Sequence, residues 1–220
     1  MVRQAFSAEL DQLRLQVEVM GVRVDQNLER MRDVLVSGDL RTAAVAVNAD
    51  DDIDAMNVSL TERCYELIAR EAPVASDLRF VVSVLRVLGE LERVGDLALR
   101  VVKLTPDADL LRSGGRTYDI LLSMADAAVA QYRQALRAWS AQDLALAEDL
   151  LGSSQLMDAT TDQLMRELLR LDGPDAVPCA LRTMVAGQAL DRIADHAAII
   201  GARLRYLITG DPDHLATEIR

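Results

Sequence analysis

Apolar residues recur every three or four positions along most of the chain, which is the pattern of amphipathic helices. Residues 10–35 show it most clearly, with Leu, Val or Met at every such step. The pattern breaks at Gly38, and Asp39 is a residue type that commonly caps the start of a helix. A second helix is therefore predicted from Asp39 to about Arg70.

A third helix is predicted after Pro73, because proline ends the preceding helix. Ser76 or Asp77 can cap this helix, which should end near Leu104. The next segment, residues 106–116, combines proline, aspartate, serine and two glycines. That composition predicts a linker.

The helical pattern then recurs in the second half of the chain. Helices are predicted over residues 117–138 and 143–171, and a last one ends near Leu207. Residues 172–174 (DGP) and Pro178 should interrupt the chain before the last helix.

Nothing in the chain alternates like a β-strand, so the predicted fold class is all-α, with two three-helix bundles related by an internal repeat. The predicted units are the first repeat 1–105, the linker 106–116, the second repeat 117–210 and a polar tail 211–220.

Two motifs carry the internal repeat. In the third predicted helix, residues 92–96 (ERVGD) match residues 191–195 (DRIAD) of the sixth. Both have an acid, an arginine, a β-branched residue, a small residue and an aspartate. In the second helix, residues 50–56 (DDDIDAM) resemble residues 158–164 (DATTDQL) more loosely.

The looser match has two alignments. Asp158 can be placed opposite Asp50, or one helical turn along, opposite Asp54. The second alignment leaves Ser154 opposite Asp50. The sequence alone leaves both alignments open.

The repeated motifs contain acids four positions apart, which lie on one face of a helix, one turn from each other. Each pair falls in a row of mostly apolar residues, where an unpaired carboxylate is costly to desolvate. Such acids need cations, and hard oxygen ligands suit Mg or Ca, while carboxylate clusters also hold Fe, Mn or Zn. The four pairs are Asp50/Asp54, Glu92/Asp96, Asp158/Asp162 and Asp191/Asp195.

Arginine side chains are an alternative source of positive charge. Arg93 and Arg192 lie inside the motifs, and Arg100 comes one turn after Asp96. Ion pairs from these residues could neutralise the acids without any metal. His196 likewise has two interpretations, as a metal ligand or as a residue held by a hydrogen bond.

Charge and composition narrow the function classes. A net charge of −11 disfavours binding to nucleic acid or anionic lipid. Charged residues run through the first thirty positions and no apolar run could cross a bilayer, so a cytoplasmic protein is expected, with its two cysteines buried and reduced. The sequence shows no nucleophile–base arrangement and no glycine-rich phosphate loop, so no catalytic residue is assigned. It also shows no cluster of arginines that would predict direct binding of phosphate.

The ordered motifs resemble those of the PhoU family, and the resemblance extends over nearly the whole chain. The matching segments are Asp50-xxx-Asp54, residues 73–79 (PVASDLR), 91–96 (LERVGD), 191–197 (DRIADHA) and 206–210 (YLITG).

This resemblance implies a protein of two three-helix bundles that regulates without catalysis. It implies a negative regulator of phosphate uptake and of the phosphate-starvation response, acting as an adaptor between the ATP-binding subunit of the phosphate ABC transporter and a sensor histidine kinase. It also implies clusters of Fe, Zn, Mn or Mg at the carboxylate motifs. The candidate ligands are then Asp50, Asp54, Glu92, Asp96, Asp158, Asp162, Asp191 and Asp195. The chain departs from the family where Arg100 and Ile199 replace an Asn that is frequent one turn after the motif aspartate.

Two other functions stay open. A structural helical adaptor without metal would share the fold and differ only in its ligands and partners. A carboxylate-bridged di-metal enzyme needs a Glu-x-x-His from each of two helices, whereas Ile193 stands three positions before His196. The long apolar stripes are compatible with a homodimer, and contact with the membrane is expected only through partners.

Overall fold

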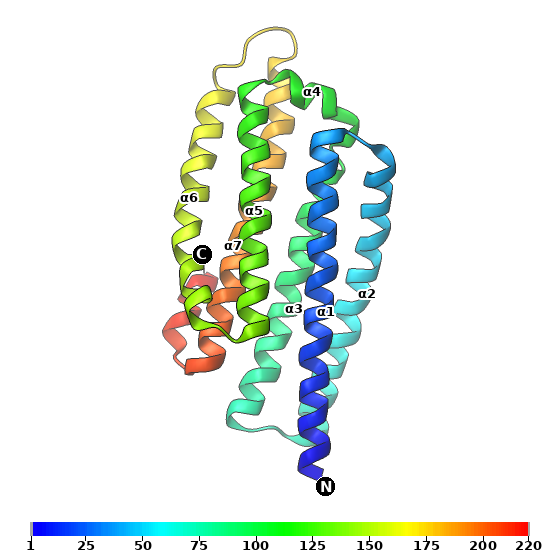
Figure 1. The fold of residues 1–220 in the computed structure, drawn as a ribbon, viewed down its shortest axis with the longest axis vertical. Helices are drawn as coiled ribbons and strands as arrows, with labels where there is room; N and C mark the ends of the chain where they lie inside the picture. Colours follow the sequence, from blue (N-terminus) through cyan, green and yellow to red (C-terminus); the bar gives the residue numbers. More distant parts are fainter. Residues whose placement is uncertain (1, 220) are drawn as a thin grey trace.

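The computed structural model describes residues 2–219, and across them the chain forms helices without a β-strand. Residues 1 and 220, at the ends of the predicted first repeat and polar tail, lie outside this range. Six long helices run roughly along the longest axis of the molecule (Figure 1). The prediction of an all-α fold is therefore confirmed. The six are α1 (Val2–Ser37), α2 (Leu40–Glu71), α3 (Ala75–Val102), α5 (Arg116–Ala141), α6 (Leu144–Leu168) and α7 (Ala176–Thr209).

The long helices form the two predicted three-helix bundles. Helices α1, α2 and α3 pack against one another, while α7 packs against both α5 and α6, which also contact each other. The bundles meet through α1 with α5 and α3 with α7. Helices α2 and α6 lie at opposite edges of the molecule (Figure 1). A single apolar core runs through both bundles, which fixes α3 and α7 side by side.

Equivalent aspartates cap the second helix of each bundle. The Asp39 carboxylate accepts hydrogen bonds from the backbone N–H groups of Arg41 and Thr42. Asp143 does the same for the first turn of α6. The prediction of a cap at Asp39 is confirmed, because its side chain satisfies N–H groups that lack a partner within the helix.

Two predicted helix boundaries were wrong. Helix α3 begins at Ala75, and its N-cap residue Val74 makes no side-chain hydrogen bond. Ser76 and Asp77 therefore lie inside the first turn, where an acid still interacts favourably with the helix dipole. Pro178 lies in the first turn of α7 and does not interrupt it. A proline is tolerated there because that N–H has no partner within the helix.

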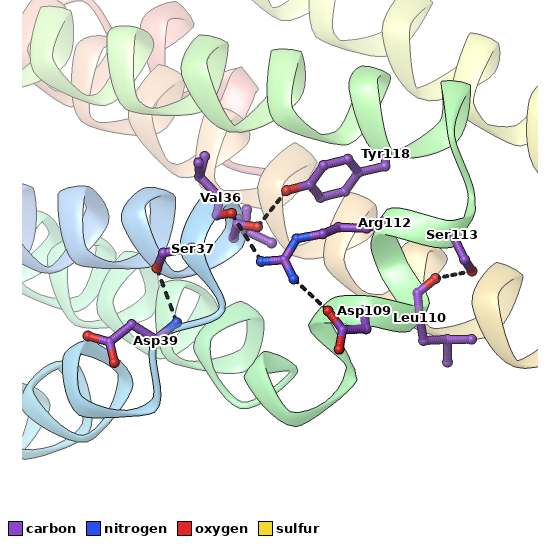
Figure 2. Close-up of polar contacts among 9 residues, drawn as sticks. Val36, Ser37, Asp39, Asp109, Leu110, Arg112, Ser113 and Tyr118 are labelled. Carbon is purple, nitrogen blue, oxygen red and sulfur yellow. Dashed lines mark hydrogen bonds and ion pairs between the residues drawn. The ribbon is translucent and has the colours of Figure 1, made fainter.

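The predicted linker is itself helical. It contains a 3-10 turn, η1 (Thr105–Asp107), and a short helix, α4 (Ala108–Ser113), which packs on α7. The Arg112 guanidinium donates hydrogen bonds to the Val36 carbonyl at 3.1 Å and to the Asp109 carboxylate at 2.7 Å (Figure 2). The Tyr118 hydroxyl donates to a carbonyl at the end of α1, at 2.8 Å. These contacts tie the connection to the end of α1.

The C-terminal segment and the two cysteines are also part of the helical fold. A final 3-10 segment, η2 (Pro212–Ile219), packs back on α7 within the predicted polar tail. Cys64 and Cys179 are buried free thiols. In the part of the chain that the structure describes, no helix has the length and apolarity that a membrane span requires.

Candidate functional site

The structure brings the four predicted acids of the first repeat together across two helices. Asp50 and Asp54 of α2 lie close enough to Asp96 of α3 for its charge to affect both, and Glu92 is affected by Asp54 and Asp96. We call these four residues the first carboxylate row. It forms where α2 and α3 pack together.

Asp50 is the buried member of the first carboxylate row, with 5% of its surface exposed. Its Oδ1 atom has no hydrogen-bond partner among the described residues. Gly95 of α3 makes room for it, because a Cβ atom at Gly95 would lie 3.0 Å from Asp50 Oδ1. The small residue in the ERVGD motif thus allows a carboxylate to enter the helix interface.

Burial and mutual repulsion weaken the acidity of this row. Burial, together with the charges of Asp54 and Asp96, raises the pKa of the Asp50 carboxyl to about 6, while Lys103 opposes the change. Burial and neighbouring acids also raise the pKa of Asp54 and of Glu92. A nearby cation would stabilise the charged form of these carboxyl groups, which burial and repulsion disfavour.

The second repeat gathers three of its four predicted acids. The charge of Asp158 on α6 reaches both Asp191 and Asp195 on α7, which lie one helical turn apart. Partial burial is the main cause of a raised pKa at Asp191 and Asp195. The Thr161 hydroxyl donates a hydrogen bond to Asp191 Oδ1 at 3.0 Å, which opposes the shift there. We call Asp158, Asp191 and Asp195 the second carboxylate row.

The structure favours one of the two alignments of the repeat. The caps Asp39 and Asp143 are equivalent, and the same offset superimposes Asp158 on Asp54. Buried positions agree at this offset, with Ala43, Ala46, Ile53 and Leu60 of α2 corresponding to Ala147, Leu150, Met157 and Leu164 of α6.

The second carboxylate row is therefore not a full copy of the first. The exposed Asp162 corresponds to Val58, and the equivalent of Asp50 is Ser154, whose side chain lies outside the described residues. An acid matching the buried Asp50 is missing because position 154 is a serine.

The structure does not support the alternative that arginine side chains neutralise the acids through ion pairs. Among the described residues, none of the eight predicted acids makes an ion pair within 4.0 Å. Arg93, Arg100 and Arg192 are exposed and contact a different surface, between α3 and α7. Among the described residues, the acids of the two carboxylate rows thus have no direct ion-pair partner.

His196 connects the two repeats. Its Nδ1 atom lies 2.5 Å from Glu90 Oε2 of α3, and both side chains are largely buried. This contact supports the interpretation of His196 as a hydrogen-bonded residue. Glu90 and Thr161 carry no signal in the sequence that would connect them to these acids, whereas Gly95 is visible as the small residue between two acids of its motif.

The donor chemistry of the first carboxylate row fits a hard divalent cation. It offers carboxylate oxygens, one of them buried and without a hydrogen bond. Within residues 2–219, however, no three Asp, Glu, His or Cys side chains are grouped closely enough to hold one metal ion together. The row supplies ligand atoms without a preformed coordination shell, and metal binding by the eight acids stays a prediction.

Comparisons with known proteins identify relatives of this chain by sequence and by fold. The sequence matches the PhoU domain twice, over residues 17–105 and 121–204. A phosphate-specific transport system accessory protein PhoU homolog from Pseudomonas aeruginosa is 28% identical over 211 residues, which cover 95% of this chain and 87% of the relative.

Two crystal structures have the same fold. PhoU from Pseudomonas aeruginosa matches with a TM-score of 0.87 at 28% identity, covering 94% of this chain and 100% of the other. The phosphate transport system regulatory protein PhoU from Streptococcus pneumoniae matches with a TM-score of 0.84 at 26% identity, covering 94% of this chain and 98% of the other.

Proposed function

The chain belongs to the PhoU family, and we propose that it is an accessory regulator of a phosphate-specific transport system. The observation that carries the proposal is the double PhoU domain match, whose two segments contain both carboxylate rows. In this proposal the protein works in the cytoplasm, restrains phosphate uptake and the starvation response when phosphate is plentiful, and catalyses no reaction.

The proposed mechanism is that of an adaptor. One surface binds the ATP-binding subunit of the transporter and another binds a sensor histidine kinase. The carboxylate rows, which have no ion pair among the described residues, would hold Mg, Mn, Fe or Zn through their oxygen atoms. A bound cation supplies positive charge there, and a change of surface charge alters the choice of partner.

A cell-based experiment tests the regulatory role. The gene is deleted, and phosphate uptake and a phosphate-starvation reporter are measured in phosphate-rich medium. Loss of the protein should raise both, and the restored gene should lower both again. Unchanged uptake and reporter activity in the deletion strain would contradict the proposal.

A binding experiment tests the adaptor mechanism and the role of the acids. Purified chain is titrated with the ATP-binding subunit and, separately, with the cytoplasmic part of the kinase. Glu92→Ala and Asp195→Ala should change at least one affinity, whereas Glu66→Ala, an exposed acid of α2 outside the carboxylate rows, should change neither. Wild-type affinity in both row variants would remove the acids from partner recognition.

Elemental analysis tests the metal. We expect the untagged wild-type protein to contain a divalent metal that falls in the Asp191→Ala/Asp195→Ala variant. A folded protein without metal, which retains partner binding, would instead support a helical adaptor that works through its surface alone.

A further inference from the structure

A hollow of about 360 Å³ lies between α3 and α7, where the two repeats meet. We call it the inter-repeat hollow. The two carboxylate rows flank it. The first row uses a neighbouring face of α3, and the second row uses a neighbouring face of α7. The polar residues that line the hollow are Arg93, Asp96 and Arg100 of α3, and Gln188, Arg192 and His196 of α7.

The arginines of the inter-repeat hollow come from both repeats. Arg93 and Arg192 occupy the same position in the ERVGD and DRIAD motifs, and Arg100 lies two turns after Arg93 on α3. All three side chains belong to exposed residues, and none forms an ion pair within 4.0 Å among the described residues. Three guanidinium groups therefore face one space without a carboxylate bound to them.

A second hollow of similar size, about 350 Å³ and lined by residues of α1 and α5, provides a comparison within the molecule. Two of its three arginines are paired with acids: Arg32 pairs with Asp126, and Arg133 pairs with Asp25 and Glu29. Size alone does not distinguish the two hollows. What distinguishes them is that most arginines between α1 and α5 are ion-paired, whereas none of the three between α3 and α7 has an ion pair within 4.0 Å among the described residues.

The charge balance of the inter-repeat hollow is positive in a strongly acidic protein. Three guanidinium groups face one lining carboxylate, that of Asp96, and His196 is held by Glu90. Unpaired like charges repel one another, so an anion placed among them is stabilised. A guanidinium group presents parallel N–H donors that match two oxygens of a phosphate.

We propose that the inter-repeat hollow binds a phosphate group, with Arg93, Arg100 and Arg192 as its ligands. Gln188 adds a neutral amide donor at the rim. The group can be free inorganic phosphate or the phosphoryl end of a monoester, because both present the same oxygens. This inference rests on the geometry of α3 and α7 and stands whether or not the adaptor mechanism holds.

Calorimetric titration of the purified chain tests the proposal. The protein is first treated with a chelator, so that phosphate cannot bind through metal at the carboxylate rows. Inorganic phosphate and phenyl phosphate are titrated separately at constant ionic strength. We expect saturable binding at one site per chain for at least one of the two, and the tighter ligand identifies the source of the phosphate group.

Matched variants separate the site from general charge effects. Arg93→Gln/Arg192→Gln should weaken binding about tenfold or more, because it removes charge-assisted hydrogen bonds from both repeats. Arg32→Gln/Arg137→Gln makes the same change of net charge at the other hollow and should leave the affinity unchanged. These arginines are at least partly exposed, so the variants should fold, which thermal unfolding would check.

A gain of affinity provides an independent check. Asp96→Asn removes the one lining acid of the described residues and should tighten binding about threefold to fivefold, by relieving a repulsion of roughly 1 kcal/mol. Three results would overturn the proposal: no saturable binding of either ligand, binding that disappears with the chelator, or equal weakening by both arginine double variants.

Discussion

Replacing Asp50 by asparagine should make the metal-free protein more stable at neutral pH. Asp50 is buried, its Oδ1 atom has no hydrogen bond among the described residues, and its charge is repelled by Asp54 and Asp96. Asparagine keeps the shape that fits beside Gly95 and carries no charge, and a neutral amide costs less to bury than a carboxylate.

The magnitude follows from proton linkage. The pKa of the Asp50 carboxyl is about 6 in the folded chain, against about 3.9 when unfolded. The folded state therefore binds this proton more tightly, so the resulting stabilisation is complete below about pH 4 and is lost as the pH rises through about 6. From about pH 5 to about pH 7 the loss is about 1.3 kcal/mol, which solvent screening near the exposed Asp54 reduces to about 1 kcal/mol.

Urea denaturation in chelator, followed by circular dichroism, measures this effect. The free energy of unfolding is determined for the wild type and for Asp50→Asn at about pH 5 and about pH 7. The wild type should lose about 1 kcal/mol more than the variant over this interval. Carboxyls far from Asp50 contribute equally to both proteins, so the difference measures Asp50 together with its coupling to Asp54 and Asp96.

A variant at an exposed acid of the same helix serves as the control for this measurement. Glu66→Gln changes an exposed acid on the same helix and should keep the pH dependence of the wild type. An equal loss of stability by Asp50→Asn and the wild type between the two pH values would contradict the prediction. A variant less stable than the wild type at about pH 7 without metal would also contradict it, because burial of the carboxylate would then cost little.

Three further sets of substitutions test the local structure, each measured by urea or thermal unfolding. Asp39→Ala and Asp143→Ala should each lower the free energy of unfolding by about 1 kcal/mol, because each removes a helix cap. A loss at only one of the two positions would contradict their equivalence. Tyr118→Phe should cost about 1 kcal/mol through its lost hydrogen bond to α1, and an unchanged stability would contradict a tethered linker. His196→Ala should cost about 1 kcal/mol, and Glu90→Ala in the same background should then add little, since the two share one contact.

The sequence predicted the helices well because their apolar spacing is a local property. The seam between Leu13 and Leu35 is buried, as its period of three to four residues requires. The start of α3 was predicted less well, since Ser76 and Asp77 are good capping residues that also suit a first turn. The loose match of α2 with α6 was decided by the equivalent caps Asp39 and Asp143 and by burial, which place Asp158 opposite Asp54.

The partners of the motif residues could not be predicted, because they depend on which helices face each side of α3 and α7. Successive residues of a helix point about 100° apart, so Glu92 and Arg93 face different neighbours although they adjoin in sequence. The pKa of Glu92 is raised by acids of α2 and α3, whereas Arg93 lines the inter-repeat hollow with α7.

Asp96, four residues after Glu92 and three after Arg93, lies between these two stripes and contributes to both surfaces. The same separation holds on α7, where Asp191 faces α6 and Arg192 faces the hollow. One short motif of an acid, an arginine and an aspartate thus builds two surfaces of opposite charge on a single helix. Among the described residues, the ion pairs that its composition suggests do not form, because its charges are directed to different sides of the bundle.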